Sequence, residues 1–164
     1  MGGRNGYGAK LANIYSKWFS VIIKDPETKQ EYSQEWFDNM STCYPPKMKK
    51  FNGATASVSV SFKPDWSRFG MKDMENGIYK IMEKRVWDAN ICTSANCKVK
   101  FNGEALPKQN FEAYAKMHTG VDNVHCATTD RWSVCIGPSE DVMQVSFVNG
   151  ICTTKGGTNV DHDA

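Results

Sequence analysis

The sequence has no long hydrophobic run and no strong excess of charge of either sign. Its nearest approach to a membrane-spanning segment, Val21-Ile22-Ile23, is far shorter than the roughly 20 apolar residues that such a helix needs. The 164 residues have a net charge of +2, and their dense basic cluster is Lys47, Lys49 and Lys50. Because nucleic-acid-binding domains usually carry a strong basic patch, this cluster is interpreted as a solvated loop. The composition therefore argues against a membrane protein and against a module that binds DNA by itself.

The cysteines also lack the spacing that metal or redox chemistry would need. There is no Cys-x-x-Cys pair, and Cys92/Cys97 and His125-Cys126 are only weak candidates for zinc ligands. No secretory signal is visible, and a chain of this length can bury a core without cross-links. The sequence therefore predicts free thiols in a reducing, intracellular compartment. The six cysteines are Cys43, Cys92, Cys97, Cys126, Cys135 and Cys152.

Glycine is concentrated at the start of the chain, where four glycines fall within residues 2–8. The apolar positions that follow are Leu11, Ile14, Tyr15 and Trp18. This is the spacing of a helix that buries one face. A glycine-rich loop that leads into a helix presents unpaired backbone N–H groups and the positive end of the helix dipole. With Arg4 and Lys10 on either side, the segment predicts an anion site, for a nucleotide triphosphate.

The standard phosphate-binding motifs do not describe this loop. A P-loop needs Gly-Lys-Ser/Thr, but Gly8 is followed by Ala9-Lys10-Leu11, so no hydroxyl is placed for Mg²⁺. The dinucleotide-binding motif would need a third glycine at Leu11 and a strand ahead of the loop. An ordinary turn before a helix therefore stays open as the alternative interpretation.

The remaining sequence predicts a mixed α and β chain. Alternating and β-branched residues predict strands over residues 19–24, 32–38, 55–62, 97–101, 132–136 and 142–148. Helices are predicted over residues 71–89 and 110–117, the first with a buried apolar stripe. The Asn102-Gly103 pair predicts a tight hairpin turn. Residues 42–52 are expected to form a surface loop and residues 119–130 a linker between two structural units.

One family resembles this chain along nearly its whole length. The run Gly3–Leu11 is similar to the triphosphate-binding loop of the ATPase domain of eukaryotic-type DNA topoisomerase II, a member of the GHKL ATPase superfamily. Further blocks match in the same order. They are Trp36–Met40, Phe62–Asp65, Arg85–Asp88, Phe101–Gly103 with Leu106-Pro107, Ser146–Ile151 and Thr153–Thr158.

The resemblance implies an α+β fold. Residues 1–120 would form the C-terminal half of a GHKL (Bergerat-type) α/β sandwich, and residues 121–164 the first strands of a transducer domain. The parent enzyme would bind ATP with Mg²⁺, form a homodimer, act on double-stranded DNA and work in the nucleus, with no membrane partner. Both ends of the chain are accordingly expected to be cut within a longer protein.

The resemblance also assigns the site. The ATP-binding residues that it implies are Arg4, Asn5, Gly6, Tyr7, Gly8, Ala9 and Lys10. It implies no catalytic or metal-binding residue here, because the family's acidic base, metal-binding asparagine and adenine-binding loop lie upstream. Glu83, Asp88 and Glu112 are interpreted as surface or ion-pair residues. His118 and His125 are interpreted as surface or loop histidines.

Two other interpretations stay open beside the enzyme. One is a truncated GHKL-type module that only binds or interacts, without turnover. The other is a relative of the MutL proteins or of the GHKL chaperones, which the blocks after residue 36 disfavour. At the C-terminal edge the family pattern has a histidine and a tyrosine where this chain has Asn159 and His162.

Overall fold

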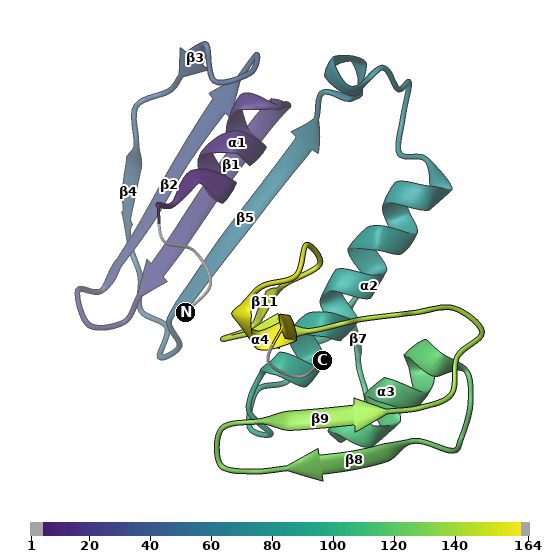
Figure 1. The fold of residues 1–164 in the computed structure, drawn as a ribbon. Helices are drawn as coiled ribbons and strands as arrows, with labels where there is room; N and C mark the ends of the chain where they lie inside the picture. The colour runs from purple at the N-terminus through teal and green to yellow at the C-terminus, as the bar shows by residue number, and fades with distance from the viewer. Residues whose placement is uncertain (1–4, 162–164) are drawn as a thin grey trace. The chain divides into compact units, whose positions relative to one another are not determined.

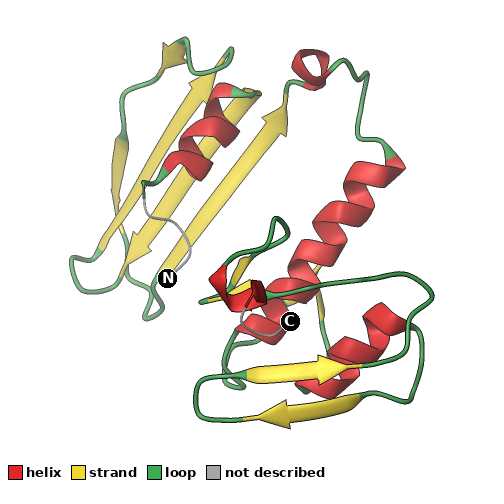
Figure 2. Ribbon diagram, viewed as in Figure 1, coloured by secondary structure: helices red, strands yellow, loops and turns green. Residues whose placement is uncertain are grey.

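The structure is a computed structural model that describes residues 5–161. The chain divides into two compact units, whose described parts are residues 5–75 and residues 76–161. The first unit is mostly antiparallel sheet, whereas the second holds the longest helix and three separate two-stranded hairpins (Figure 2). The mixture of helices and antiparallel sheets is the α+β architecture that the sequence predicts.

The first unit is a five-stranded sheet with one α-helix against it (Figure 1). Its elements are α1 (Tyr7–Ile14), β1 (Ser16–Asp25), β2 (Gln30–Phe37), β3 (Thr42–Cys43), β4 (Lys47–Lys50), β5 (Ser57–Pro64) and a 3₁₀ helix, η1 (Trp66–Phe69). The strand order is β3-β2-β1-β5, and β4 pairs with β2. Strand β1 is therefore central, with antiparallel partners on both sides.

The core of this sheet centres on Phe19, whose ring lies between aromatic side chains of the two neighbouring strands. Phe19 on β1 lies opposite Trp36 on β2 and Phe62 on β5, and only 3% of its surface is exposed. The ring centroids of Trp36 and Phe62 lie 5.8 and 6.2 Å from that of Phe19. The alternation over 55–62 thus correctly predicts a strand. Its apolar face is not buried within the described chain, because Val58 and Val60 are 68% and 51% exposed.

Two further expectations for this unit are wrong. Residues 42–52 do not form only a loop, because β3 and β4 lie there and pair with β2. In this register Lys49 faces Glu31, so charges of opposite sign meet across the two strands. The first helix ends at Ile14 rather than continuing to Trp18, which lies in β1.

The second unit is built around helix α2 (Asn76–Cys92). Its other elements are β6 (Lys100–Phe101), β7 (Glu104–Ala105), α3 (Phe111–Thr119), β8 (His125–Thr128), β9 (Ser133–Ile136), β10 (Phe147–Val148), β11 (Ile151–Cys152) and α4 (Thr158–Asp161). The β6–β7 hairpin turns at Asn102 and Gly103, with φ of 50° and 86°. This left-handed pair is what the Asn-Gly signal predicts. In the described part of the chain, no helix is both long and apolar enough to cross a membrane.

Helix α2 buries a different face from the one that the sequence predicts. The helix begins at Asn76 rather than at Met71, so Met74 lies outside it, and Ile81 and Met82 of the methionine and isoleucine stripe are 57% and 39% exposed. The buried residues of the helix are instead Asp88 and Asn90, at 5% and 2% exposure. Polar side chains can take buried positions when they are hydrogen-bonded, and partners from the following segments supply those bonds.

The segment after α3 is more regular than expected. Residues 119–130 are not only a linker, because they contain β8, which pairs with β9. Conversely, the strand expected over 142–148 is confined to β10, which pairs with β11. Figure 1 shows the β8–β9 hairpin in green beside α3.

The prediction that all six cysteines are free thiols is wrong for two of them. Cys126 on β8 and Cys135 on β9 are joined by a disulfide, with their Cα atoms 4.1 Å apart. They are direct partners in the hairpin register, which brings their side chains together on one face. Spacing along the sequence could not reveal this pair, because the pairing depends on a strand at 125–128 that was not predicted.

Candidate functional site: the glycine loop and the N-terminus of helix α1

The N-terminus of α1 lies at the glycine-rich loop. Gly6 is the residue that precedes the helix, with φ of 66° and ψ of 16° in the left-handed region. No side chain caps this end, and the first turn of α1 contains no acidic residue. The first backbone N–H groups of a helix have no partner within it, so they are available to an anion.

The remaining loop residues that the structure describes are exposed and uncrowded. Asn5, Ala9 and Lys10 are exposed, and Tyr7 is 63% exposed. A Cβ built on Gly8 would meet no atom of the described residues within 4 Å outside its own helix backbone, so packing among them does not account for glycine there. The structure thus brings residues 5–10 together at one open helix end. Arg4, which the sequence also assigns to this site, lies outside the described residues.

The opposite end of α1 is tightly fixed to the sheet. The Ser16 hydroxyl donates to the Ala12 carbonyl at 2.5 Å, which ties the start of β1 to the last turn of the helix. The backbone N–H of Asn39 donates to the Ser16 carbonyl at 2.9 Å, and that of Asp65 to the Tyr15 carbonyl at 2.8 Å. The junction between α1 and β1 is therefore held by hydrogen bonds to three segments, at Ala12, Asn39 and Asp65.

Side chains from η1 add to this junction. The Tyr15 and Phe69 ring centroids lie 5.3 Å apart, and the Arg68 guanidinium lies 5.8 Å from the centre of the Tyr15 ring. Asp65 accepts from the Ser67 hydroxyl at 2.6 Å, and this hydrogen bond lowers the pKa of the Asp65 carboxyl. The carboxylate therefore stays ionised beside Arg68 and Lys17, whose nitrogens lie 3.7 and 3.8 Å away.

Asp88 forms ion pairs, which is one of the two roles expected for it, but its burial and its bond to Tyr114 were not predicted. In the second unit, Asp88 accepts hydrogen bonds from the Tyr114 hydroxyl at 2.6 Å, from the Lys84 ammonium at 2.9 Å and from the Arg85 guanidinium at 3.3 Å. Burial opposes ionisation of Asp88, but these bonds and charges outweigh it and lower its pKa. The Lys84/Asp88 spacing of four residues is that of a helical ion pair, but it gives no sign that Asp88 is buried.

His118 is a correction to the sequence analysis. It lies on α3 rather than in a loop, its ring meets that of Tyr114 edge-on at 4.6 Å, and its Nε2 is buried without a partner among the described residues. Burial lowers the pKa of His118; the nearby Lys84 charge lowers it further, and Asp88 only partly opposes this. His125, in contrast, is exposed, as expected.

We expect His118 to make the second unit less stable in mild acid. Its folded pKa lies below the usual value, so its contribution is complete above about pH 6.5 and falls as the pH drops towards the folded pKa. His118→Phe should reduce this loss between about pH 7 and pH 5. Urea unfolding at several pH values measures this loss of stability. If His118→Phe has the same pH dependence as the wild type, His118 is not its source. The pKa of the Asp88 carboxyl is lowered from its ordinary value, so its titration lies below this pH range and does not overlap with that of His118.

The comparisons with known proteins agree with this architecture. No protein-family model matches the chain. DNA topoisomerase 2 of Candida glabrata is 38% identical over 184 aligned residues, which cover 99% of this chain and 13% of that protein. DNA topoisomerase 2-beta of Homo sapiens is 40% identical over 172 residues, covering 98% of this chain and 10% of that protein.

Solved structures give the same relationship in three dimensions. The ATPase region of Saccharomyces cerevisiae topoisomerase II matches with a TM-score of 0.91 and 40% identity, over 99% of this chain and 44% of that one. The ATPase and transducer domains of DNA topoisomerase II from Balamuthia mandrillaris match with a TM-score of 0.89 and 37% identity, over 99% and 42% of the two chains.

The fold is therefore that of a topoisomerase-type ATPase region, and the predicted α+β class is confirmed. The predicted relationship is confirmed as well: the chain corresponds to a segment of the ATPase region of the type II DNA topoisomerases. It spans 13% or less of the length of the two curated relatives described above.

Proposed function

We propose that this chain is the triphosphate-binding segment of an ATP-dependent type II DNA topoisomerase. The observation that carries the proposal is the open N-terminus of α1, where Gly6 has a positive φ and the first turn has no acidic residue. The 40% identity to the ATPase region of yeast topoisomerase II supports ATP as the nucleotide. The predicted ATP-binding residues, Arg4 to Lys10, are retained in full as part of this proposal.

The residues of the loop would bind the phosphates by hydrogen bonds and charge. The backbone N–H groups at the start of α1 donate to phosphate oxygens, and the helix dipole favours negative charge there. Gly8 leaves room for phosphate atoms to approach the backbone. Lys10 is exposed and forms no ion pair with the described residues, so its ammonium is available to the triphosphate.

The chemistry of this loop does not fit direct binding of Mg²⁺. Mg²⁺ prefers carboxylate and other oxygen ligands, and the first turn of α1 has no acidic side chain. Within the described part of the chain, no group of three His, Cys, Asp or Glu residues could hold a metal ion. We therefore assign Mg²⁺ in the complete enzyme to residues outside this loop, together with the base that activates water.

The wider activity belongs to the same proposal. The complete protein would be a homodimer that uses ATP to pass one DNA duplex through another in the nucleus. The names of the relatives, DNA topoisomerase 2, support DNA as the substrate. The proposal includes a boundary near residue 120 between the ATPase domain and the transducer domain. This boundary differs from the division of the chain into two compact units, which falls between residues 75 and 76.

A binding module without turnover is the second candidate. It is favoured by the absence of an assigned catalytic base in this segment, since ATP hydrolysis requires a positioned base and a metal. Sequence that flanks this segment in the complete gene decides between the candidates, because an upstream Asp-x-Gly-x-Gly adenine-binding motif would favour the enzyme.

We expect the isolated 164-residue chain neither to hydrolyse ATP nor to bind it tightly, because the loop offers donors to the phosphates and nothing to the adenine or to Mg²⁺. Titration calorimetry with ATP and Mg²⁺ measures this, with tripolyphosphate as a control for the phosphate contacts alone. A Kd for ATP at or below the micromolar range would contradict the division of the site between this segment and the rest of the enzyme.

A further inference from the structure

The disulfide in the second unit occupies an unusual position. Cys126 and Cys135 lie directly opposite each other in the short β8–β9 hairpin, only nine positions apart in sequence. Cys126 is an exposed residue and Cys135 is a half-buried one, so the bridge lies at the surface of the hairpin rather than in a core. Disulfides that staple small domains usually come in sets, yet Cys43, Cys92 and Cys97 are free and exposed.

We propose that Cys126 and Cys135 form a reversible thiol–disulfide site, whose oxidation state controls how firmly the β8–β9 hairpin is closed. Three observations favour this over a permanent cross-link. Cys126 is an exposed residue, the bridge joins neighbours already paired by the strand ladder, and it is the single bridge among six cysteines, all of which lie in the described part of the chain. Exposed disulfides are the ones that exchange readily with small thiols.

The exchange balances with a small thiol such as glutathione as the co-reactant. Its thiolate attacks the sulfur of Cys126, the more exposed of the two residues; a new S–S bond forms there and the Cys126–Cys135 bond breaks. Cys135 leaves as a thiolate and takes a proton from water. A second thiolate then attacks the glutathione sulfur of the mixed disulfide, which releases oxidised glutathione and leaves both cysteines reduced. The reverse reaction oxidises the two thiols and reduces oxidised glutathione.

The structural consequence is local to the hairpin. Beside the disulfide, the loop end of the hairpin is held by the Thr129 N–H bond to the Trp132 carbonyl at 2.7 Å and by the Thr128 hydroxyl bond to Ser133 at 3.2 Å. Strand β8 is exposed along its length, so little apolar burial holds the hairpin closed. Reduction should therefore loosen β8 and β9 while the sheet of the first unit is unaffected.

The test uses the full wild-type chain, equilibrated with mixtures of reduced and oxidised glutathione. Rapid alkylation followed by peptide mass spectrometry gives the state of each cysteine. We expect Cys126 and Cys135 to convert together between bridged and alkylated forms, and glutathione to be trapped at Cys126 in the Cys135→Ser variant. Hydrogen exchange should rise at residues 125–136 on reduction, by about tenfold or more, and stay constant in β1.

Three results would overturn the proposal. Both cysteines could be alkylated at every glutathione ratio, which means that no bridge forms. The bridge could instead persist in excess reduced glutathione, which identifies a permanent staple. Finally, Cys126 could bridge to another cysteine. Cys97→Ser, which changes an exposed free thiol, is the matched control and should leave the conversion unchanged.

Discussion

Replacing Lys10 by alanine in the complete enzyme is expected to lower ATP-driven DNA strand passage by about 10- to 150-fold, because a hydrogen bond to a charged group contributes about 1.5–3 kcal/mol. The Lys10 side chain is exposed and forms no ion pair with the described residues, so the variant should fold normally. The measurement is relaxation of supercoiled DNA as a function of ATP concentration. DNA binding without ATP should remain largely intact.

Gly8→Val should be more severe at the same site. An added Cβ at this position meets none of the described neighbouring atoms within 4 Å, but a valine side chain would fill the space through which phosphate oxygens approach the backbone. We expect no detectable ATP-driven strand passage in this variant. If both loop variants turn over ATP normally, the assignment of the loop is wrong.

The chain offers a matched control for each substitution. Gly77 occupies the second position of α2, as Gly8 does in α1, and a Cβ there also meets nothing within 4 Å. Gly77→Val therefore carries the same cost in helix propensity without lying in the loop. Lys80→Ala removes an exposed helix lysine elsewhere. Both control variants should keep the activity of the wild type.

The second large effect is expected at Asp88. Asp88→Ala should lower the free energy of unfolding of the second unit by about 2–3 kcal/mol, because it leaves the buried Tyr114 hydroxyl and two cations without their shared partner. The Asp88 side chain is only 6% exposed, whereas those of Lys84 and Arg85 are 44% and 54% exposed, so most of the loss arises at the Tyr114 end of the cluster. Urea unfolding, with hydrogen exchange in α2 and α3, measures it.

An exposed ion pair gives the comparison. Glu112 and Lys116 are also separated by four residues, at 2.9 Å, but their side chains are 49% and 34% exposed. Glu112→Ala should therefore cost less than about 0.5 kcal/mol. If the Asp88 and Glu112 variants lose similar stability, the cluster around Asp88 is not a buried network. Tyr114→Phe should lower the free energy of unfolding by about 1–2 kcal/mol, which lies between the effects of the Asp88 and Glu112 variants.

Local signals in the sequence predicted local structure well. The Asn102-Gly103 turn is confirmed, and the helix predicted over 110–117 and the strand predicted over 55–62 are found at Phe111–Thr119 and Ser57–Pro64. The capping role of Asn110 was not predicted. Asn110 accepts from the Ala113 N–H at 2.8 Å, as a residue at this position should. The glycine loop was also found from its spacing, and Gly6 has the positive φ expected of a glycine in such a loop.

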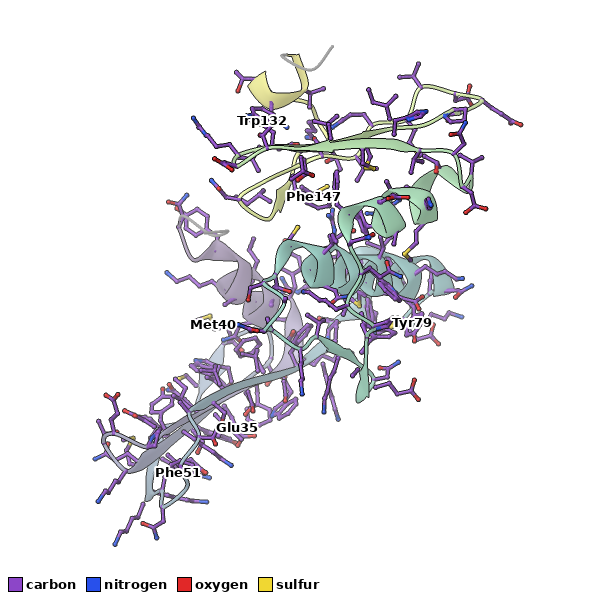
Figure 3. The ribbon with its side chains drawn as sticks, turned by 90° about the horizontal axis from the view of Figure 1, so that it is seen from below. Glu35, Met40, Phe51, Tyr79, Trp132 and Phe147 are labelled. Atoms are coloured by element: carbon purple, nitrogen blue, oxygen red, sulfur yellow. A yellow bond between two sulfur atoms is a disulfide. The ribbon has the colours of Figure 1, made fainter. Side chains whose placement is uncertain are left out.

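Burial and long-range pairing were harder to predict. The pattern at Ile81 and Met82 gives the apolar side of a helix, but not whether another element covers it, and both are exposed here. Buried Asp88 depends on Tyr114, which lies 26 residues away, so no local window contains the reason for its burial. In the first unit, the Trp18 Nε1–H bond to Glu35 and the Lys24 ammonium over the Phe51 ring also join residues that are far apart in sequence. Figure 3 labels Glu35 and Phe51.

The junction between α1 and β1 has a mechanical consequence. Only Tyr15 separates the helix from the strand, and β1 is the central strand, paired along its length with β2 and β5. A displacement of the helix cannot be absorbed by a flexible connection, because the Tyr15 and Ser16 carbonyls are themselves hydrogen-bonded to neighbouring segments. The helix and sheet therefore form one stiff body, so the sheet fixes the direction in which the open N–H groups of α1 point.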